Sequence, residues 1–250
     1  MNHLVKFQSV LESEFPGDRL TFQKAIATFH PEKAEEASLF FRLARESGIK
    51  VFITGFGNNI DPVGSPFEDM VVVRTDRLNQ LLRVVPEDFY VVVGAGYPLR
   101  ELNRALLQSD LFLPHAALPY VGSVGGATAV NLTGRLGDVD VPIKKYLIKA
   151  EIVTPTGEII SPGAVTFKSV SGYDVVKIFA ASWGLLGLLV SVTYRVMPLS
   201  GAEDFYGFTQ QAVDRGSFLA GLDESDQSTD AMYCRKIKQK FDPDQLLPIV

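Results

Sequence analysis

Two glycine-rich stretches carry the residue types best suited to binding chemistry. The first is TGFGNN at residues 54–59, and the second is YVGSVGGATAVNLTG at residues 120–134, with four glycines and no charged side chain. Glycine lets a backbone approach a ligand closely and turn its amide hydrogens toward it. Clusters of such amides bind phosphate or pyrophosphate without any lysine. The sequence therefore predicts an anion grip made of backbone amides from both stretches.

Each stretch alone could also be a tight connection that binds nothing. Asn58 and Asn59 favour binding, because they add short side-chain donors and tolerate left-handed backbone geometry. Neither stretch matches the phosphate loop of nucleotide hydrolases or the GxGxxG of dinucleotide-binding folds. Two such stretches in one chain favour a single long phosphorylated ligand held between them. The density of small residues in 120–134 predicts irregular backbone rather than an ordinary helix.

Side chains typical of metal, nucleophilic or acid–base catalysis are scarce. His3, His30 and His115 are isolated, without the spacing of a metal site. Cys234 has no histidine nearby in sequence, and the serine nucleophile signature GxSxG is absent. We therefore expect no metal site, assign no catalytic residue, and favour chemistry that a bound cofactor supplies.

The hydrophobic periodicity predicts the elements that must position the two stretches. The N-terminal helix is expected to bury Leu4, Phe7, Val10, Leu11 and Phe15 on one face. The mixed order of strands and helices predicts an α+β fold rather than a doubly wound sheet. Strands are expected at 27–31, 50–54, 69–75, 89–96 and 187–198, a hairpin at 144–163, and helices at 1–15, 31–48 with Pro31 in its first turn, 98–110, 174–182 and 231–241.

The composition restricts the class of protein. The chain has 250 residues, and its net charge of −5 argues against a nucleic-acid partner. The N-terminus lacks the pattern of a secretory signal. Residues 178–194 are uncharged, but they are too short for a membrane span and are interrupted by Gly184 and Gly187. We expect a cytoplasmic protein without a span, held at most to the inner face of a membrane through a complex.

The order of the motifs resembles a known flavoprotein family. TGFGNN, GAGYPLRELNRALLQSDLFLP, VGSVGGATAVNLTG, VTPTGEII and SVSGYDVVKIFAASWGLLGLLVSVTYRVMP follow one another over residues 27–198, and KIKQKFDPDQLLP comes later. This order is similar to the FAD-binding domain of the vanillyl-alcohol oxidase / p-cresol methylhydroxylase (PCMH-type) family. Within that family it looks most like the small FAD-binding subunit of glycolate oxidase.

The resemblance implies a fold and a site. Residues 1–198 would form the FAD-binding domain, with subdomains at about 27–110 and 111–198, and residues 199–250 a short remnant of the cap region plus a C-terminal helix. Gly172, Tyr173 and Asp174 match a family motif near the cofactor. The residues implied to bind FAD are Thr54, Gly55, Phe56, Gly57, Asn58, Asn59, Pro119, Gly122, Ser123, Val124, Gly125, Gly126, Thr128, Asn131, Gly134, Gly187 and Val190.

The chain departs from the family pattern at several positions. Asn58 and Asn59 stand where covalent members often have a histidine, which implies non-covalent FAD. Phe56 replaces a glycine, and Ala181 and Leu185 replace the glycine and threonine of a later motif. Only about thirty residues separate Pro198 from the terminal helix, too few for the family's substrate-binding cap. The family's metal-binding histidines have no counterpart.

Three functions fit the resemblance. The first is an FAD-binding oxidoreductase subunit in a complex that oxidises a 2-hydroxyacid such as glycolate or D-lactate, with a larger flavoprotein or iron–sulfur subunit as partner. The second is a stand-alone enzyme whose pocket an oligomer completes, with Tyr173, His115, Arg135 or Tyr146 facing the substrate. The third is a scaffold that has lost FAD. Gly125→Val is expected to abolish FAD retention while leaving the fold largely intact.

Overall fold

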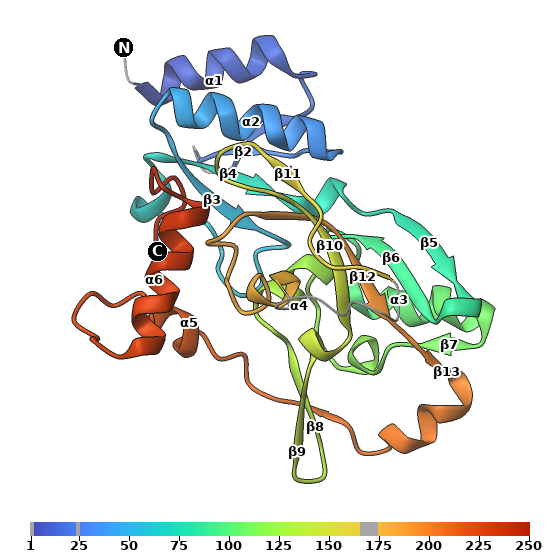
Figure 1. Ribbon diagram of the computed structural model, residues 1–250. Helices are drawn as coiled ribbons and strands as arrows, with labels where there is room; N and C mark the ends of the chain where they lie inside the picture. The colour runs from blue at the N-terminus through green and yellow to red at the C-terminus, as the bar shows by residue number, and fades with distance from the viewer. Residues whose placement is uncertain (1–2, 24–25, 166–174) are drawn as a thin grey trace.

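Two separate β-sheets organise the chain, in a computed structural model that describes residues 3–23, 26–165 and 175–250 (Figure 1). The first has the order β1-β2-β4-β3, in which β3 and β2 both run parallel to β4. The second is antiparallel, with the order β11-β10-β12-β6-β5. The mix of helices and sheets confirms the predicted α+β class. The strands are β1 (Leu20–Gln23), β2 (Ile26–Phe29), β3 (Lys50–Thr54), β4 (Met70–Arg74), β5 (Leu81–Val85), β6 (Tyr90–Gly94), β10 (Leu147–Val153), β11 (Ile159–Ile160) and β12 (Leu188–Arg195).

Two helices, α1 (His3–Glu14) and α2 (Ala34–Glu46), lie side by side next to the first sheet (Figure 1). Their packing is aromatic, because the ring of Phe40 stacks on that of Phe29 at 4.6 Å and meets Phe7 edge-on at 5.8 Å. The acidic residues Glu35 and Glu36 lie in the first turn of α2, where their negative charges interact favourably with the helix dipole. Apolar burial and dipole complementarity together explain why this segment is helical.

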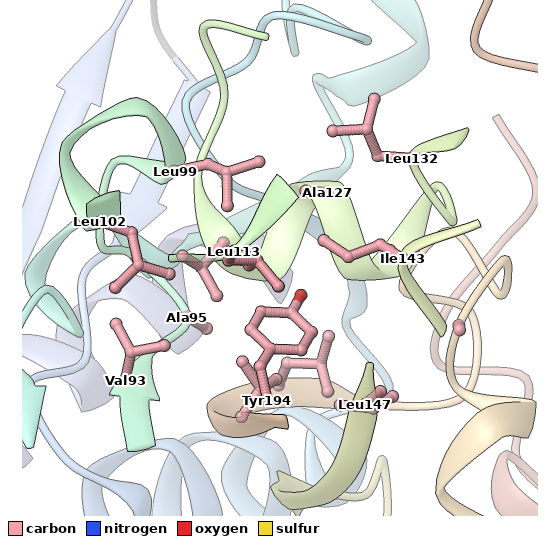
Figure 2. Close-up of a cluster of buried hydrophobic side chains, with 14 of the residues drawn as sticks. Val93, Ala95, Leu99, Leu102, Leu113, Ala127, Leu132, Ile143, Leu147 and Tyr194 are labelled. Carbon is pink, nitrogen blue, oxygen red and sulfur yellow. The ribbon is translucent and has the colours of Figure 1, made fainter. Parts of the chain in front are cut away.

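The second core forms where α3 (Leu99–Leu106) and α4 (Val124–Ala129) pack against the second sheet. Figure 2 shows Tyr194 of β12 reaching into this core beside Ala127, with Leu113 and Ile143 nearby. The Tyr194 hydroxyl is buried and forms a hydrogen bond of 2.6 Å with the hydroxyl of Thr128. This bond fixes α4 on the strand that runs beneath it.

Short elements complete the chain. The hairpin of β8 (Thr133–Leu136) and β9 (Val139–Pro142) extends from the body (Figure 1). β14 (Thr209–Gln210) pairs with β8. Two two-residue strands, β7 (Leu111–Phe112) and β13 (Met197–Pro198), pair with each other. The C-terminal part carries α5 (Gly216–Ala220) and α6 (Thr229–Phe241). None of the described helices is both long and apolar enough to cross a membrane.

The structure differs from several sequence predictions. A helix, α4, forms inside the glycine-rich stretch, where irregular backbone was expected, because the Ser123 side chain caps it. Pro31 precedes α2 rather than entering its first turn, since the helix begins at Ala34 and Lys33, with an extended backbone conformation, is its N-cap residue. The predicted helix around 174–182 is a single 3-10 turn, Val175–Ile178, in its described part. Val10 is 36% exposed, whereas the other four residues of its predicted face are buried.

The division of the chain into domains stays a prediction. The predicted boundaries lie near residues 110 and 198, whereas the hydrogen-bonded sheets change over between β4 and β5. Residues 199–230 contain a 3-10 segment Leu199–Phe205, β14 and α5.

Candidate functional site

Two adjoining clefts, of about 480 and 430 Å³, lie where the loop after β3 meets α4. They share six lining residues, which come from β3, the loop that follows it, α4 and the segment before β12: Ile53, Thr54, Gly55, Gly126, Ala129 and Trp183. The two glycine-rich stretches predicted to act together therefore do meet, one on each side of this double cleft.

The loop after β3 forms the first wall. Its side chains reach across the cleft, where Asn58 Nδ2 donates to the carbonyl of Val121 and Asn59 Nδ2 to the Tyr120 hydroxyl, each at 3.1 Å. Arg74 holds the loop from behind by donating to the carbonyl of Phe56 at 3.0 Å. Within the part of the chain that the structure describes, the backbone amides of residues 56–59 donate to no protein acceptor. These four donors are available to a ligand.

The first turn of α4 forms the second wall, and its amides are used within the fold. The amide of Val124 donates to the carbonyl of Tyr97 at 2.8 Å, and that of Gly125 to Ala95 at 2.7 Å. The amide of Gly126 donates to the Ser123 hydroxyl at 3.0 Å. The free amides of this wall therefore lie just before the helix, because among the described residues the amides of Tyr120, Val121, Gly122 and Ser123, like those of residues 56–59, donate to no protein acceptor.

The two neighbouring glycines of α4 have different tasks. A Cβ atom at Gly125 would lie 2.7 Å from the Cβ of Ala95, so glycine is required there for α4 to pack on the end of β6. The expectation that Gly125→Val would leave the fold intact is wrong for this reason. A Cβ at Gly126 would lie 3.1 Å from the Tyr120 hydroxyl and 3.2 Å from the Ser123 hydroxyl, two side-chain ends. Gly126 is thus the glycine that keeps the cleft open.

The turn after β4 contributes a buried hydroxyl. Thr75 lines the second cleft, is 5% exposed, and its Oγ1 has no hydrogen-bond partner among the described residues. A buried hydroxyl without a partner is costly unless a ligand or water completes it. Thr75 is therefore a candidate ligand contact that the sequence reasoning missed, although its place directly after a buried strand was a usable signal.

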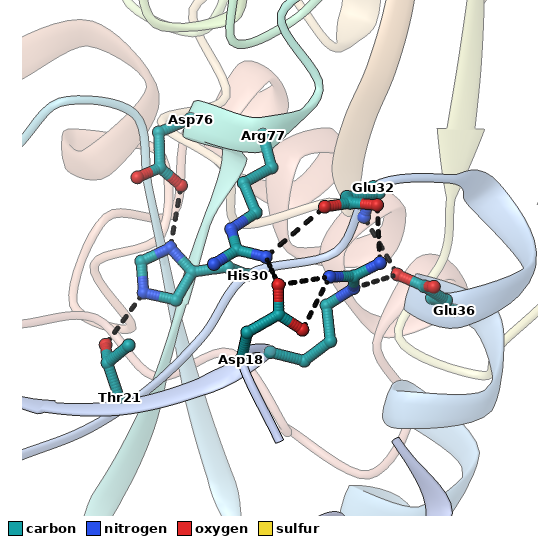
Figure 3. Close-up of polar contacts among 8 residues, drawn as sticks. Asp18, Thr21, His30, Glu32, Glu36, Asp76 and Arg77 are labelled. Carbon is teal, nitrogen blue, oxygen red and sulfur yellow. Dashed lines mark hydrogen bonds and ion pairs between the residues drawn. The ribbon is translucent and has the colours of Figure 1, made fainter. Parts of the chain in front are cut away.

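A polar network holds this turn in place (Figure 3). His30 bridges Asp76 and Thr21, each at 2.8 Å, and Arg77 donates to Asp18 at 2.6 Å. The hydrogen bond from Arg77 lowers the pKa of the Asp18 carboxyl, and Asp18 in return raises the pKa of Arg77. The network ties the turn at residues 75–77 to β1 and β2, which fixes Thr75 beside the cleft.

A second buried network supports the segment before β12. Lys238 of α6 donates to the carbonyl of Leu185 at 3.0 Å and to that of Leu247 at 2.8 Å, and it also pairs with the carboxylate of Asp242. Burial lowers the pKa of Lys238, while Asp242 opposes that shift. The basic helix and the Phe-Asp-Pro turn that follows it therefore anchor the segment that lines the cleft.

The cleft itself is almost free of charge. Among the described residues that line its two halves, Tyr120 is the only ionisable side chain. Burial raises the pKa of Tyr120, and the hydrogen bond from Asn59 partly offsets this. The lining can thus offer neutral donors and apolar surface, but it has neither a cation to pair with phosphate nor an ordinary general base.

The structure places the predicted site residues in two groups. Thr54, Gly55, Phe56, Gly57, Asn58, Asn59, Gly122, Ser123, Gly125, Gly126 and Gly187 line the clefts. Pro119 is exposed, Val124 and Thr128 are buried in the core, the Asn131 side chain accepts from the amide of Lys144, Gly134 faces Phe208, and Val190 lines a different cavity. The role of each residue in binding stays a prediction. Trp183, which the sequence reasoning also missed, lines both clefts.

The candidate substrate side chains that the structure describes, His115, Arg135 and Tyr146, lie outside the cleft lining. His115 is fully buried, with its Nε2 2.8 Å from the carbonyl of Val141, and burial lowers its pKa to about 4. Its ring meets that of Tyr146 edge-on at 5.3 Å, and Arg135 pairs with Asp140. Gly172, Tyr173 and Asp174 fall outside the described residues.

Known proteins share this sequence pattern and fold. A family model described as "FAD binding domain" matches residues 25–163. D-lactate dehydrogenase of Archaeoglobus fulgidus is 29% identical over 168 residues, which are 67% of this chain and 38% of that protein. Glycolate oxidase subunit GlcD of Bacillus subtilis is 27% identical over 173 residues, 69% of this chain and 37% of that one. Glycolate oxidase subunit GlcE of Escherichia coli is 27% identical over 116 residues, which are 45% of this chain and 33% of that protein.

A solved structure agrees at the level of the fold. An alkyldihydroxyacetonephosphate synthase matches with a TM-score of 0.64 and 21% identity, over 78% of this chain and 40% of that chain. The chain spans less than two fifths of the length of the curated relatives above.

Proposed function

The chain belongs to the FAD binding domain family, and on that premise we propose that it is the FAD-binding part of an oxidoreductase that oxidises a 2-hydroxyacid. Membership confirms the family resemblance and identifies FAD as the cofactor. Two of the similar proteins are named as glycolate oxidase subunits and one as a D-lactate dehydrogenase, which supports this substrate class.

One observation carries the proposed site, namely the four unpaired amides of residues 56–59 at the edge of an uncharged double cleft. Unpaired amides in a glycine-containing loop suit a pyrophosphate, which needs several donors converging on it. The unpartnered Thr75 hydroxyl gives a further donor in the second cleft. Because Gly126 has no side chain, it leaves space in the cleft that a Cβ atom would partly fill. The residues present therefore fit FAD.

The cofactor is held without a covalent bond in this proposal. Among the described lining residues there is no histidine or cysteine that could attach to a flavin. Affinity would come from neutral hydrogen bonds, apolar burial and a binding surface whose two walls are already joined by Asn58 and Asn59.

The chemistry divides between the cofactor and the protein. FAD, when bound, supplies the acceptor for the two electrons of the oxidation. The chain's own residues bind and orient it, and the apolar lining from Phe52, Ile60 and Leu189 keeps water away. Oxidation of a hydroxyl carbon also needs a base for the hydroxyl proton, and the described cleft lining offers none apart from Tyr120.

This missing base supports a subunit rather than a stand-alone enzyme. The acid–base residues and the pocket for the hydroxyacid carboxylate would come from a partner: a larger flavoprotein, an iron–sulfur subunit, or a second copy of the chain. The proposed role of this chain is to hold FAD and pass its electrons on.

The test uses the purified chain loaded with FAD and freed of excess ligand by gel filtration. We expect flavin absorbance to co-elute with the chain, and acid denaturation to release intact FAD. Anaerobic D-lactate and glycolate should leave the absorbance unchanged, whereas dithionite should bleach it. Bleaching by a hydroxyacid would contradict the subunit assignment in favour of a stand-alone enzyme, and failure to retain FAD would contradict the proposed site.

A further inference from the structure

We propose that Trp183 is a stacking surface for a planar heteroaromatic ring of the cofactor. The inference rests on the proposed FAD site and adds a residue whose ring fixes one end of the ligand. Trp183 lines both halves of the double cleft, and it also lines a smaller cavity of about 250 Å³ beside Phe52 and Ile60. The chain has one tryptophan, and it is half-buried at the junction of these spaces.

The backbone that carries this ring is held in an unfavourable conformation. Trp183 has a φ of 53°, and its neighbours Ala181 and Gly184 have φ values of 67° and 78°. A left-handed conformation is rare for a bulky residue, and such strain persists only where surrounding contacts enforce it. Strain of this kind is concentrated at ligand-binding sites, and here it places the largest side chain of the segment beside the cleft.

The contacts that enforce the conformation come from both sides of the segment. The amide of Trp183 donates to the carbonyl of Ala129 at 3.0 Å, which satisfies an otherwise unpaired group at the end of α4. Lys238 holds the carbonyl of Leu185, two residues further along. The indole is therefore carried on a segment tied to α4 and α6.

The side chain is also held by a cation. The guanidinium of Arg215 lies 5.9 Å from the centroid of the indole ring, within the range of a cation–π contact. This contact restrains the ring while the same side chain lines the clefts. A restrained indole at the boundary of an uncharged cleft is well suited to stack on a neutral π system, because little side-chain freedom is lost on binding.

FAD contains two rings of this class, the isoalloxazine and the adenine. Removing an aromatic side chain on which a base stacks typically weakens binding by about 10- to 100-fold. We therefore expect Trp183→Leu to weaken FAD binding by about this factor, and Trp183→Phe to restore most of the affinity. Leucine and phenylalanine meet the same backbone constraint at this φ, so the comparison isolates the ring.

The matched control is Tyr233→Leu on α6. Tyr233 is also an aromatic side chain with a cation near its ring, since Lys236 Nζ lies 5.8 Å from its centroid, but it is 60% exposed and lines none of the clefts. Equilibrium titration with FAD is made for the unmodified chain and all three variants, with circular dichroism as the check of folding. Affinity equal to the unmodified chain in Trp183→Leu overturns the inference while leaving the FAD site itself standing.

Two fragments assign the ring. ADP carries the adenine and pyrophosphate, and FMN carries the isoalloxazine and one phosphate. If Trp183→Leu weakens the binding of ADP but not of FMN, the ring that stacks on Trp183 is the adenine. Selective weakening of FMN, with brighter flavin emission from bound FAD, assigns the isoalloxazine, because a stacked indole quenches flavin emission.

One measurement needs no variant. Because Trp183 is the single tryptophan, a bound ring must shield its emission from acrylamide, so the lifetime-corrected quenching constant should fall when FAD is added. An unchanged constant in FAD-loaded chain overturns the stacking role even if the leucine variant fails to fold. If the unmodified chain binds no FAD at all, both the proposed function and this inference are wrong.

Discussion

The side-chain amide of Asn59 donates a hydrogen bond to the phenolic oxygen of Tyr120, 3.1 Å away, and this bond joins two cleft walls that lie 61 residues apart in sequence. Asn58 makes a parallel connection to the carbonyl of Val121. The loop after β3 and the segment leading into α4 are therefore fixed relative to each other before any ligand arrives. Such preorganisation raises affinity because less ordering is left to occur on binding.

Asn59→Ala removes one of these two connections. A hydrogen bond of this kind contributes about 1 kcal/mol, so we expect roughly fivefold weaker FAD binding. Isothermal titration measures the effect. Asn79→Ala is the matched control, because Asn79 is exposed and lines none of the clefts. Equal losses in both variants would contradict a specific role for the connection.

Thr75→Val separates ligand binding from stability. The Thr75 hydroxyl is buried without a partner, so replacing it by a methyl group should leave the unfolding free energy unchanged or raise it by about 1 kcal/mol. FAD binding should weaken in the same variant. Chemical denaturation and FAD titration give the two values, and a destabilised variant with unchanged FAD affinity would show that the hydroxyl serves the fold.

His115 predicts a pH dependence of stability. Burial lowers its pKa from 6.5 to about 4 in the folded chain. The unfolded chain therefore takes up this proton at a higher pH than the folded chain. The contribution of His115 to the unfolding free energy amounts to about 3 kcal/mol. This contribution is complete above pH 6.5 and is lost as the pH falls to about 4.

Denaturation at pH 7 and pH 4 checks this for the unmodified chain and for His115→Asn. The unmodified chain should lose about 3 kcal/mol more than the variant over that interval, since its other titrating groups are shared. A parallel loss in both proteins would mean that His115 titrates normally.

Lys238→Met tests the anchor of the segment before β12. The substitution leaves the carboxylate of Asp242, 1% exposed, without its cation, and it frees the carbonyl of Leu185. Breaking a buried pair in this way typically costs about 3 to 5 kcal/mol of unfolding free energy. Lys240→Met, on the exposed face of the same helix, should cost little. Similar values for the two variants would contradict the anchoring role.

The sequence predicted the elements whose pattern is local. β3, β4, β6 and α2 follow from periodic apolar residues, and the cleft forms where the two glycine-rich stretches were expected to meet. The hairpin β8–β9 was missed, although Gly137 and Asp138 at its turn are a recognised hairpin signal. Helix α4 was missed because its two glycines have weak helix propensity, and the Ser123 cap and the contact with Ala95 after β6 stabilise it instead.

Tertiary contacts decided what the sequence left open. Whether Gly125 or Gly126 faces the ligand depends on Ala95, which belongs to a different element. The amides of Val124 and Gly125 are occupied by the carbonyls of Tyr97 and Ala95, which follow β6, so no local pattern could assign them. Thr75 enters the cleft from a turn that carries no binding motif, and Trp183 enters it from a family motif in which no role was assigned to that position.

The most direct test of the FAD site is the FAD affinity of Gly126→Val. Valine at this position would project into the shared part of the double cleft, so we expect binding to weaken by about 100-fold or more, equivalent to about 3 kcal/mol. Gly17→Val is the control, since a Cβ there meets no atom within 4 Å. Retained folding with FAD binding lost only in Gly126→Val is the predicted result. Unchanged FAD affinity in a folded Gly126→Val variant would contradict the placement of FAD in this cleft.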